Sequence, residues 1–492
     1  MQYRQAIKGD IVAIKDKLAG AQRQLKKYAA RAGQFRVRES DSGPTASAQT
    51  ARVSVVIPVF NAMPYLKELL DSLAAQDMDP ALFEVVAVDD GSTDDGRKLL
   101  DEYAARHPNW RVIHQQNSGW PGKPRNVGIN AGTSDYVFFC DADDKLGAEA
   151  LRRMVAFADR HQVDVLAPKM VGIGGRRVQS SLFTETVPDV PVRKILATLS
   201  PQKLIRRELL DSHGFRFPEG KVRLEDGMLL TRCYLASRRN AIAADYDYYF
   251  IRTRQDGTNI SAQKAAPESY TGSVSEIARI ITENHDDADE AELLVLDLYR
   301  RKLLRAYVPS RFRQMPAAIR KRWVEAHAGF VDQYIPERLE AQLGFPFRQR
   351  SQLVRARDTE GLLKLADTEE ALKPTARALP PQLDDESVAF GLRFEPAAEF
   401  DSVRVVARGR GTTEARTFDV KRDAGEYRAV LPRTELAGLG NVLVDLFVQL
   451  GLGGMEGPPR RILAPGEGLP VQSGGLRVYA TVHGNLSLDQ RR

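Results

Sequence analysis

The sequence predicts a multidomain α/β protein, and three observations lead to this prediction. With 492 residues, the chain exceeds the size at which one hydrophobic core keeps growing. Continuous apolar runs alternate with helical patterns over residues 51–265, which is typical of a three-layer α/β sandwich. The pattern is helical over 266–379, and from 380–492 it alternates with a period of two. We therefore expect an α/β domain, a basic helical connector and a C-terminal β-sandwich.

Five apolar runs predict the strands of the first domain, because each is too continuous for a half-exposed strand and suits a parallel sheet covered on both faces. These runs are residues 53–60, 83–90, 111–115, 136–143 and 163–168. Pro64 suits a first helical turn. The buried stripe of that helix would be Leu66, Leu69, Leu70 and Leu73, and Leu99, Leu100 and Tyr103 supply the next helix.

A separate segment, residues 1–50, precedes this domain. Apolar residues between Ile7 and Tyr28 recur at alternating spacings of four and three, which predicts one helix with a narrow apolar seam. A short coiled coil fits this seam, while the lysines on the other faces favour peripheral contact with a membrane as the rival interpretation. The Ser-, Gly- and Pro-rich segment 39–50 is typical of a linker.

Composition narrows the class of protein. No stretch of the sequence approaches the roughly 18 to 20 uncharged apolar residues that span a bilayer. The N-terminus lacks the apolar core of a signal peptide, so we expect a cytoplasmic protein. The inner face of the membrane is an expected place of contact. The two cysteines, Cys140 and Cys233, are too few for a disulfide framework and are expected to be buried. A net charge of +6 favours an anionic partner, but no nucleic-acid-binding module accompanies it.

Carboxylates at the ends of the predicted strands are the informative feature, because ligands of open α/β sheets bind beyond those ends. One strand ends in Asp89 and Asp90, and another leads into Asp141, Asp143 and Asp144. Helix capping is the structural alternative for such residues, and we assign it to Asp94 or Asp95. The Asp-Ala-Asp spacing places two carboxylates on the same side of an extended chain, which suits a hard divalent cation that keeps open positions for phosphate oxygens. An EF-hand is excluded, because Lys145 and Leu146 stand at its ligand and glycine positions.

Four blocks in order identify a resemblance. The blocks are VSVVIPVFNAMPYLKELLDSL, VVAVDDGSTDDG, NSGWPGKPRNVGINAGTSDYVFFCDADD and RLEDGMLLTRCYL. They are similar to family 2 glycosyltransferases of the GT-A fold, whose sheet is Rossmann-like, and most closely to the bacterial wall teichoic acid β-N-acetylglucosaminyltransferases, whose acceptor is poly(ribitol phosphate). The resemblance covers residues 52 to about 262 well, and the C-terminal β-region only in architecture.

The resemblance implies the donor site residue by residue. Pro58 and Asp90 would hold the uridine. Asn117 and Arg125 would contact the base and the diphosphate; a surface position on a helix is the alternative for Arg125. Asp141 would lie by the ribose, the neighbouring Ala142 would also belong to the donor-binding residues, and Asp143 would coordinate Mn²⁺ or Mg²⁺ at the diphosphate. The closing loop over the diphosphate would supply Arg252, Arg254, Asn259 and Ser261.

An inverting displacement at the anomeric carbon needs a base on the face opposite the nucleotide. We assign this base to Asp226, with Glu225 supporting it or orienting the acceptor; N-capping of a helix that begins near Gly227 is the alternative for Asp226.

The C-terminal pattern predicts short strands with Gly-rich turns after a break at 373–381. The alternating apolar residues are Val388, Phe390, Leu392 and Phe394, then Val403 and Val405, then Val442, Val444, Leu446 and Val448, and lastly Val478, Ala480 and Val482. The run GLGGMEG at 451–457 misses the dinucleotide fingerprint, because Glu456 takes the third glycine position, and is predicted as a loop. This domain would join subunits into a homo-oligomer, a trimer or a dimer, or bind the acceptor.

Together with these residues, the resemblance implies an inverting, metal-dependent enzyme that moves a sugar from a UDP-sugar, expected to be UDP-N-acetylglucosamine, to a hydroxyl of an anionic cell-wall polymer such as teichoic acid. The alternatives are another polysaccharide or a lipid-linked acceptor, or a non-catalytic scaffold that binds sugar nucleotide or polymer. A nucleotidyltransferase is disfavoured, because PVFNAMPY stands where its Gly-rich loop should follow the first strand.

Overall fold

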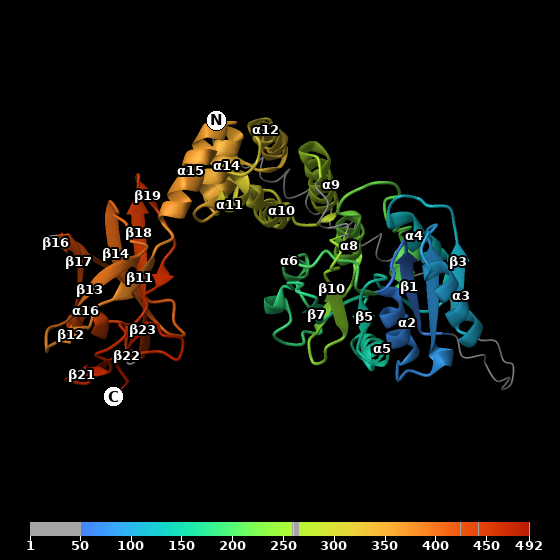
Figure 1. Ribbon diagram of the computed structural model, residues 1–492, viewed down its shortest axis with the longest axis horizontal. Coiled ribbons are helices and arrows are strands. Elements are labelled where there is room, and N and C mark those ends of the chain that lie inside the picture. The colour runs from blue at the N-terminus through green and yellow to red at the C-terminus, as the bar shows by residue number, and fades with distance from the viewer. Residues whose placement is uncertain (1–50, 258, 260–264, 424, 441, 492) are drawn as a thin grey trace, which may run out of the picture. The chain divides into compact units, whose positions relative to one another are not determined.

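The computed structural model describes residues 51–257, 259, 265–423, 425–440 and 442–491. Along these ranges an α/β part is followed by a helical part and then by a β part (Figure 1). The predicted N-terminal helix and linker lie outside the described residues. No helix in the described ranges is both long enough and apolar enough to cross a membrane.

A seven-stranded sheet forms the centre of the α/β part, in the order β3-β2-β1-β4-β8-β6-β9. Its strands are β1 (Val53–Val59), β2 (Phe83–Asp89), β3 (Trp110–His114), β4 (Tyr136–Phe139), β6 (Val165–Pro168), β8 (Leu204–Arg206) and β9 (Asn240–Ala243). The four strands β1 to β4 are parallel neighbours, as predicted. The prediction of a fully parallel sheet is wrong, because β8 lies antiparallel between β4 and β6. A strand of three residues is too short to give a recognisable apolar run in the sequence.

Helices cover both faces of this sheet, which gives the expected three layers. Ile57 of β1 belongs to the core that includes helices α2, α3 and α5, whereas its neighbour Val56 belongs to the core that includes α4 and α8. The helix α4 lies close to β1 at Gly128, where a Cβ would come within 2.3 Å of a Val56 methyl carbon. Only glycine fits at this contact, so Gly128 fixes the distance between this helix and the sheet.

The helical elements of the α/β part are α2 (Leu66–Ala74), η1 (Pro80–Leu82), α3 (Gly96–Arg106), α4 (Gly122–Ala131), α5 (Ala150–His161), η2 (Ser180–Leu182), α6 (Val192–Ile195), α7 (Arg207–Ser212) and α8 (Glu225–Ala236). Helix α2 begins at Leu66, so Pro64 precedes the helix and does not stand in its first turn. Helix α8 begins at Glu225, two residues earlier than predicted, because the backbone turns sharply at Leu224. A small sheet, β5 (Lys145–Leu146), β10 (Tyr249–Arg252) and β7 (Met170–Ile173), completes this part.

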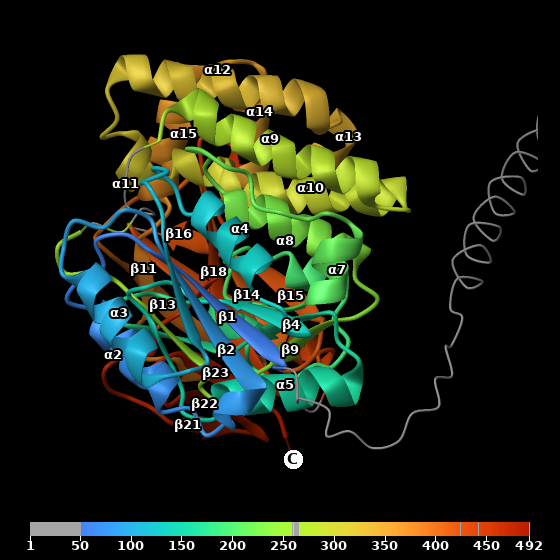
Figure 2. The ribbon, with the colours of Figure 1, turned by 90° about the vertical axis from the view of Figure 1, so that its right-hand side faces the viewer.

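The connector is helical, as predicted. Its elements are α9 (Pro267–Asn284), α10 (Ala288–Lys302), η4 (Leu304–Tyr307), α11 (Pro309–Phe312), α12 (Ala317–Tyr334), α13 (Glu337–Glu340), α14 (Phe347–Arg355) and α15 (Thr359–Ala371). Helix α9 packs against α8, α10 and α12 (Figure 2). The apolar side chains of these helices therefore continue the core on the α8 side of the sheet.

Two sheets surround one apolar core in the β part. The first contains β11 (Thr375–Ala378), β12 (Gln382–Leu383), β13 (Ser387–Glu395), β16 (Lys421–Asp423) and β17 (Glu426–Pro432). The second contains β14 (Ser402–Gly409), β15 (Ala415–Asp419), β18 (Leu443–Leu452), β19 (Met455–Glu456), β20 (Arg460–Arg461), β21 (Val471–Ser473), β22 (Leu476–Ala480) and β23 (Leu486–Asp489). A short helix, α16 (Arg433–Ala437), follows β17.

Three local predictions in the β part are wrong. The predicted break at 373–381 contains β11, whose few residues gain their hydrogen bonds from distant parts of the chain, by pairing with β13 and by a bridge to Leu463. The predicted loop at 451–457 contains a hairpin, because β18 continues to Leu452 and pairs with β19. The last predicted strand is too long: Val478 is buried, but Ala480 is exposed and Val482 is 97% exposed.

Candidate functional site

The parallel strands bring the predicted acidic residues to one edge of the sheet. β1 lies between β2 and β4, so the carboxyl ends of these three strands are neighbours. Asp90 follows β2 directly, and Asp141 comes two residues after β4. This edge is where open α/β sheets bind their ligands.

Asp90 is held in a polar pocket at this edge. Its carboxylate accepts hydrogen bonds from the backbone N–H of Ser118 at 3.0 Å, from the Ser118 hydroxyl at 2.8 Å and from Gln115 Nε2 at 2.5 Å. Asn117 Nδ2 donates to the Asp90 carbonyl oxygen at 2.9 Å. Gly91, at φ +77°, permits this approach, since a Cβ there would lie 2.9 Å from the Asn117 nitrogen. Asp90 and Asn117 thus come together, and Gln115 and Ser118 are partners that the sequence did not reveal.

Pro58 completes this end of the site. It lies on β1, paired in register with Val88 of β2, two residues before Asp90. The side chain of Pro58 is partly exposed at a position where its neighbours in β1 are buried. The structure therefore brings Pro58 to the same strand ends as the other uridine-site candidates.

Arg125 lies at the centre of the site. It is only 3% exposed, so the alternative of a surface position on a helix is wrong. Its Nη2 donates to Asp141 Oδ1 at 2.8 Å and its Nη1 to Asp226 Oδ1 at 2.6 Å, while Glu225 Oε1 lies 3.4 Å from Nη1. Burial disfavours the guanidinium charge, but the charges of Asp226, Asp141 and Glu225 outweigh burial and raise the pKa of Arg125. One guanidinium therefore joins Asp141, predicted to lie by the ribose, to Asp226, the predicted base.

Asp226 lies in the first turn of α8, where the helix dipole favours negative charge. Its side chain keeps 23% exposure, whereas that of Glu225 keeps 8%. Burial raises the pKa of Asp226 well above its ordinary value, against the lowering effect of Arg125. Leu224 enters the helix in the left-handed region at φ 58°, a conformation that costs a branched residue roughly 1 to 2 kcal/mol. This turn directs both acids toward Arg125, and the helix N-cap is Leu224, which makes no side-chain capping bond.

Asp143 is contacted by the predicted closing loop. Arg254 Nε donates to Asp143 Oδ2 at 2.6 Å, and Asn259 Nδ2 lies 3.3 Å from the same oxygen. Arg252, the last residue of β10, donates from Nε to the Asp143 carbonyl oxygen at 2.8 Å and pairs with Glu68. Ala142 is buried between the two aspartates. Ser261 lies outside the described residues.

Two buried residues also belong to the site, although no pattern in the sequence indicated them. Gln202 Nε2 donates to Asp141 Oδ2 at 2.7 Å, on the carboxylate oxygen that Arg125 leaves open. Lys203 follows it and is fully buried, with Nζ 2.9 Å from the Ser200 carbonyl oxygen. Burial lowers the pKa of Lys203 to about 7. Both residues lie just before β8, in a segment with no recognisable motif.

The residues fit a divalent cation at Asp143. Carboxylate oxygens are the ligands that Mg²⁺ and Mn²⁺ prefer, and the carboxylate of Asp143 lies near enough to Asp141 to be affected by its negative charge. Burial, followed by the charge of Asp141, raises the pKa of Asp143, so a cation placed there would relieve both effects. The described residues contain no cluster of three or more potential ligands, so most of the coordination would have to come from phosphate and water.

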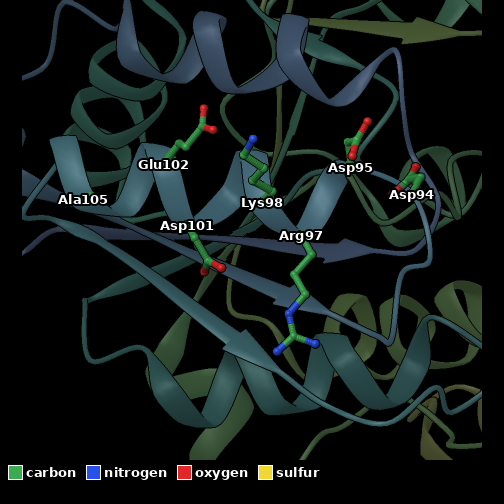
Figure 3. A pocket seen from close by; sticks show the side chains of 7 residues that line it. All are labelled: Asp94, Asp95, Arg97, Lys98, Asp101, Glu102 and Ala105. Carbon is green, nitrogen blue, oxygen red and sulfur yellow. The ribbon is translucent and has the colours of Figure 1, made fainter.

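A surface hollow elsewhere in the α/β part contains none of these residues. It is lined by side chains of α3 and the turn before it, which are charged except for Ala105 (Figure 3). Asp94 at its rim accepts from the Met63 and Gly96 backbone N–H groups at 2.9 and 3.0 Å, which is the structural role expected for Asp94 or Asp95. The hollow is therefore not part of the candidate site.

Comparison with protein families matches two models. The model of glycosyl transferase family 2 covers residues 54–225, and the model described as the glycosyl transferase TarS linker domain covers 267–366. The second match falls on the connector helices α9 to α15.

Two curated proteins illustrate the similarity. The poly(ribitol-phosphate) beta-glucosyltransferase of Bacillus spizizenii is 32% identical over 65% of this chain and 51% of its own length. The poly(ribitol-phosphate) beta-N-acetylglucosaminyltransferase TarS of Staphylococcus aureus is 34% identical over 63% of this chain and 54% of its own length. The chain thus spans about half the length of the curated relatives it matches.

Solved structures extend the similarity to the fold. The crystal structure of S. aureus TarS superposes with a TM-score of 0.62 at 26% identity, covering 89% of this chain and 85% of that chain. TarS 1-349 in complex with UDP-GlcNAc superposes with a TM-score of 0.61 at 30% identity, covering 69% of this chain and 96% of that chain. The predicted fold class is confirmed. The chain therefore belongs to glycosyl transferase family 2, with a GT-A domain, a TarS-type linker and a C-terminal β part.

Proposed function

We propose that this chain transfers a sugar from a UDP-sugar to a hydroxyl of a poly(ribitol phosphate)-type polymer, with inversion at the anomeric carbon. The observation that carries this proposal is the guanidinium of Arg125, which lies between Asp141 at the donor edge and Asp226 on α8. This arrangement supports the proposal, because one guanidinium holds close together the two carboxylates that we assign to donor binding and to the base. The names of the relatives, which transfer glucose or N-acetylglucosamine, support the donor and acceptor classes.

In the proposed reaction Asp226 accepts the proton of the acceptor hydroxyl as its oxygen attacks the anomeric carbon. A bond forms between this oxygen and the carbon, while the bond between the carbon and the diphosphate oxygen breaks and UDP leaves. Asp90 would accept a hydrogen bond from the uracil. Asp143 would hold a divalent cation, which when bound would stabilise the negative charge on the leaving diphosphate.

Arg125 and Arg254 have a further role in this proposal. Each guanidinium now neutralises a carboxylate that the reaction needs, Asp226 and Asp143 respectively. A bound diphosphate would compete for both guanidinium groups, because arginine matches phosphate oxygens in geometry and charge. Donor binding would in this way leave Asp226 better able to act as a base.

The test is a panel of UDP-glucose, UDP-N-acetylglucosamine and GDP-mannose, each offered with and without purified poly(ribitol phosphate). We expect release of UDP that the polymer stimulates, with one of the two UDP-sugars preferred. Equal or greater use of GDP-mannose, or no sugar incorporated into the polymer, would contradict the proposal. Homo-oligomer formation, peripheral membrane contact and the cytoplasmic location remain predictions.

A further inference from the structure

The second sheet of the β part carries a cluster of arginines on its outer face. We define the Phe447 surface by Arg408, Arg410, Asp445, Phe447 and Arg461. Along β14 and β18 alternate residues belong to the apolar core, including Val405, Ala407, Leu446 and Val448. Because successive side chains in a strand point to opposite faces, Arg408, Asp445 and Phe447 lie on the outer face.

The register places these residues side by side. Arg408 is paired with Asp445 across β14 and β18, and Phe447 is paired with Arg461 across β18 and β20. The guanidinium carbons of Arg408 and Arg461 lie 5.0 and 5.1 Å from the centre of the Phe447 ring. Contact with an aromatic ring orients a guanidinium while leaving its N–H groups at the edges available for an anion.

The charges of this cluster do not balance. Asp445 pairs with Arg410 at 2.5 Å and with Arg461 at 2.9 Å, and it also accepts from the Ser487 hydroxyl at 2.9 Å. Arg408 is exposed, and within the part of the chain that the structure describes it has no ion pair. The Phe447 surface therefore holds three guanidinium groups and one carboxylate, and only two of the three contact this carboxylate, which leaves positive charge for an external anion.

We propose that the Phe447 surface is a docking site for the phosphodiester acceptor polymer, separate from the residues that carry out transfer. The proposal rests on the proposed function for the identity of the polymer. Its phosphates would bind Arg408 and Arg410, and the C–H groups of its polyol units would contact the rim of Phe447. A polymer segment held here would raise the effective concentration of its neighbouring hydroxyls at the transfer site.

Two other occupants fit less well. A second copy of this surface would bring like charges together, which disfavours self-association through it. Single-stranded nucleic acid stacks its bases on aromatic rings, and here two guanidinium groups already lie against the ring of Phe447. Both occupants are outcomes of the test.

The test variant is Arg408→Gln, because Arg408 is exposed and its loss removes no ion pair. Arg393→Gln is the matched control, since Arg393 is an exposed arginine on β13 in the other sheet. Binding to immobilised poly(ribitol phosphate) and transfer to the polymer and to a short ribitol phosphate fragment are measured at low and high salt. We expect Arg408→Gln to weaken polymer binding and to raise the KM for polymer about two- to five-fold at low salt, with the difference shrinking at high salt. The KM for the short fragment should stay at the wild-type value.

Several results would overturn this inference. These are an unchanged polymer affinity in Arg408→Gln, an equal loss in Arg393→Gln, or an equal rise in the KM for the short fragment. Tighter, Arg408-dependent binding of single-stranded RNA would assign the surface to nucleic acid, and a smaller particle mass in light scattering of Arg408→Gln would assign it to contact between copies. If the wild type bound the polymer through Arg408 but transferred no sugar to either acceptor, this result would contradict the proposed function and would still support the docking surface.

Discussion

Arg125 Nη1 lies 2.6 Å from Asp226 Oδ1, so the carboxylate that we propose as the base is ion-paired in this structure. The same guanidinium binds Asp141 through Nη2 at 2.8 Å. Asp141 and Asp226, which we propose for donor binding and for the base, are thus coupled through one buried cation, so a substitution of either carboxylate should affect the other.

The first prediction is that Asp226→Asn removes turnover and leaves donor affinity within a few-fold of wild type. Asparagine keeps the shape but cannot accept the proton, and general bases contribute roughly 10² to 10⁴ in rate. Turnover is measured by UDP release with polymer, and donor affinity by calorimetry. Asp211→Asn, at an exposed aspartate of α7, is the control and should behave as wild type. Full turnover in Asp226→Asn would move the base elsewhere.

The second prediction concerns the pH dependence of transfer. Burial raises the pKa of Asp226 well above 3.8, in spite of Arg125. Because the base must be deprotonated, kcat/KM for the acceptor should rise with pH through this raised pKa and then level off. Samples held at each acidic pH and assayed again at neutral pH control for unfolding. A rate that is flat from acidic to neutral pH would be incompatible with Asp226 as the titrating base.

The third prediction is that Asp143→Ala abolishes the stimulation of donor binding and transfer by Mn²⁺. Asp143 Oδ2 now binds Arg254, so the variant loses the proposed cation ligand and also frees that arginine for the diphosphate. We therefore expect UDP to bind without Mn²⁺ about as well as to wild type, while added Mn²⁺ no longer tightens it. Asp95→Ala, at an exposed position before α3, is the control. Wild-type stimulation by Mn²⁺ in Asp143→Ala would refute this ligand.

The fourth prediction concerns the stability of the connector. His327 of α12 is fully buried, its Nδ1 lies 2.8 Å from the Tyr307 hydroxyl, and burial lowers its pKa to about 3. A depressed pKa means that the unfolded state takes up the proton first. The contribution of His327 to the free energy of unfolding is therefore fully present above pH 6.5 and falls as the pH drops from 6.5 toward 3. Each pH unit in this range lowers the free energy of unfolding by about 1.4 kcal/mol.

Urea unfolding at pH 7 and pH 4.5 measures this loss, followed by tryptophan fluorescence in a Trp110→Phe, Trp120→Phe background that leaves Trp323 as the one tryptophan. Trp323 is a local reporter, since its ring lies 5.1 Å from that of His327. His327→Gln can keep a hydrogen bond to Tyr307 but does not titrate, so its stability should fall less between the two pH values. An equal fall in variant and wild type would show that other groups carry the acid sensitivity.

The sequence was sufficient for those parts of the site that depend on local spacing. Asp90, Asp141 and Asp143 follow apolar runs that had to be buried strands, and parallel strands bring their ends together. The contact between Arg125 and Asp226 joins residues 101 positions apart, and its geometry depends on how α4 and α8 pack. Gln202 and Lys203 precede a three-residue antiparallel strand whose place in the sheet is decided by its neighbours. The prediction of a strand as far as Val482 was wrong, because the alternation of apolar residues continues in the sequence after the strand has ended at Ala480.

The last prediction concerns the basic end of α10, which we expect to contribute to holding the polymer. Within the described ranges, Arg300 and Arg301 form ion pairs, whereas Lys302 and Arg305 form none. Arg300 and Arg301 both pair with Asp297, at 2.6 and 2.5 Å. Burial, followed by the charges of Arg301 and Arg305, lowers the pKa of Lys302, and Arg305 is exposed. An anion that binds at this end of α10 would therefore be attracted mainly by Lys302 and Arg305, whose positive charges are least compensated by carboxylates.

Exposed charge pairs are individually worth about 0 to 1 kcal/mol, so a single substitution such as Arg305→Gln should raise the KM for polymer at most about two- to five-fold, as we expect for Arg408→Gln. Replacing Arg300, Arg301, Lys302 and Arg305 together by Gln should raise it further at low salt and less at high salt, because salt screens such contacts. UDP release without polymer should be unaffected. Lys302→Gln with Arg305→Gln keeps the pairs with Asp297 and should retain most of the effect, whereas Arg322→Gln with Arg338→Gln, two paired arginines elsewhere in the connector, is the control. If the KM for polymer is the same in all variants and ignores salt, the connector does not hold the acceptor, and the affinity of this basic chain for a phosphate polymer must come from another surface.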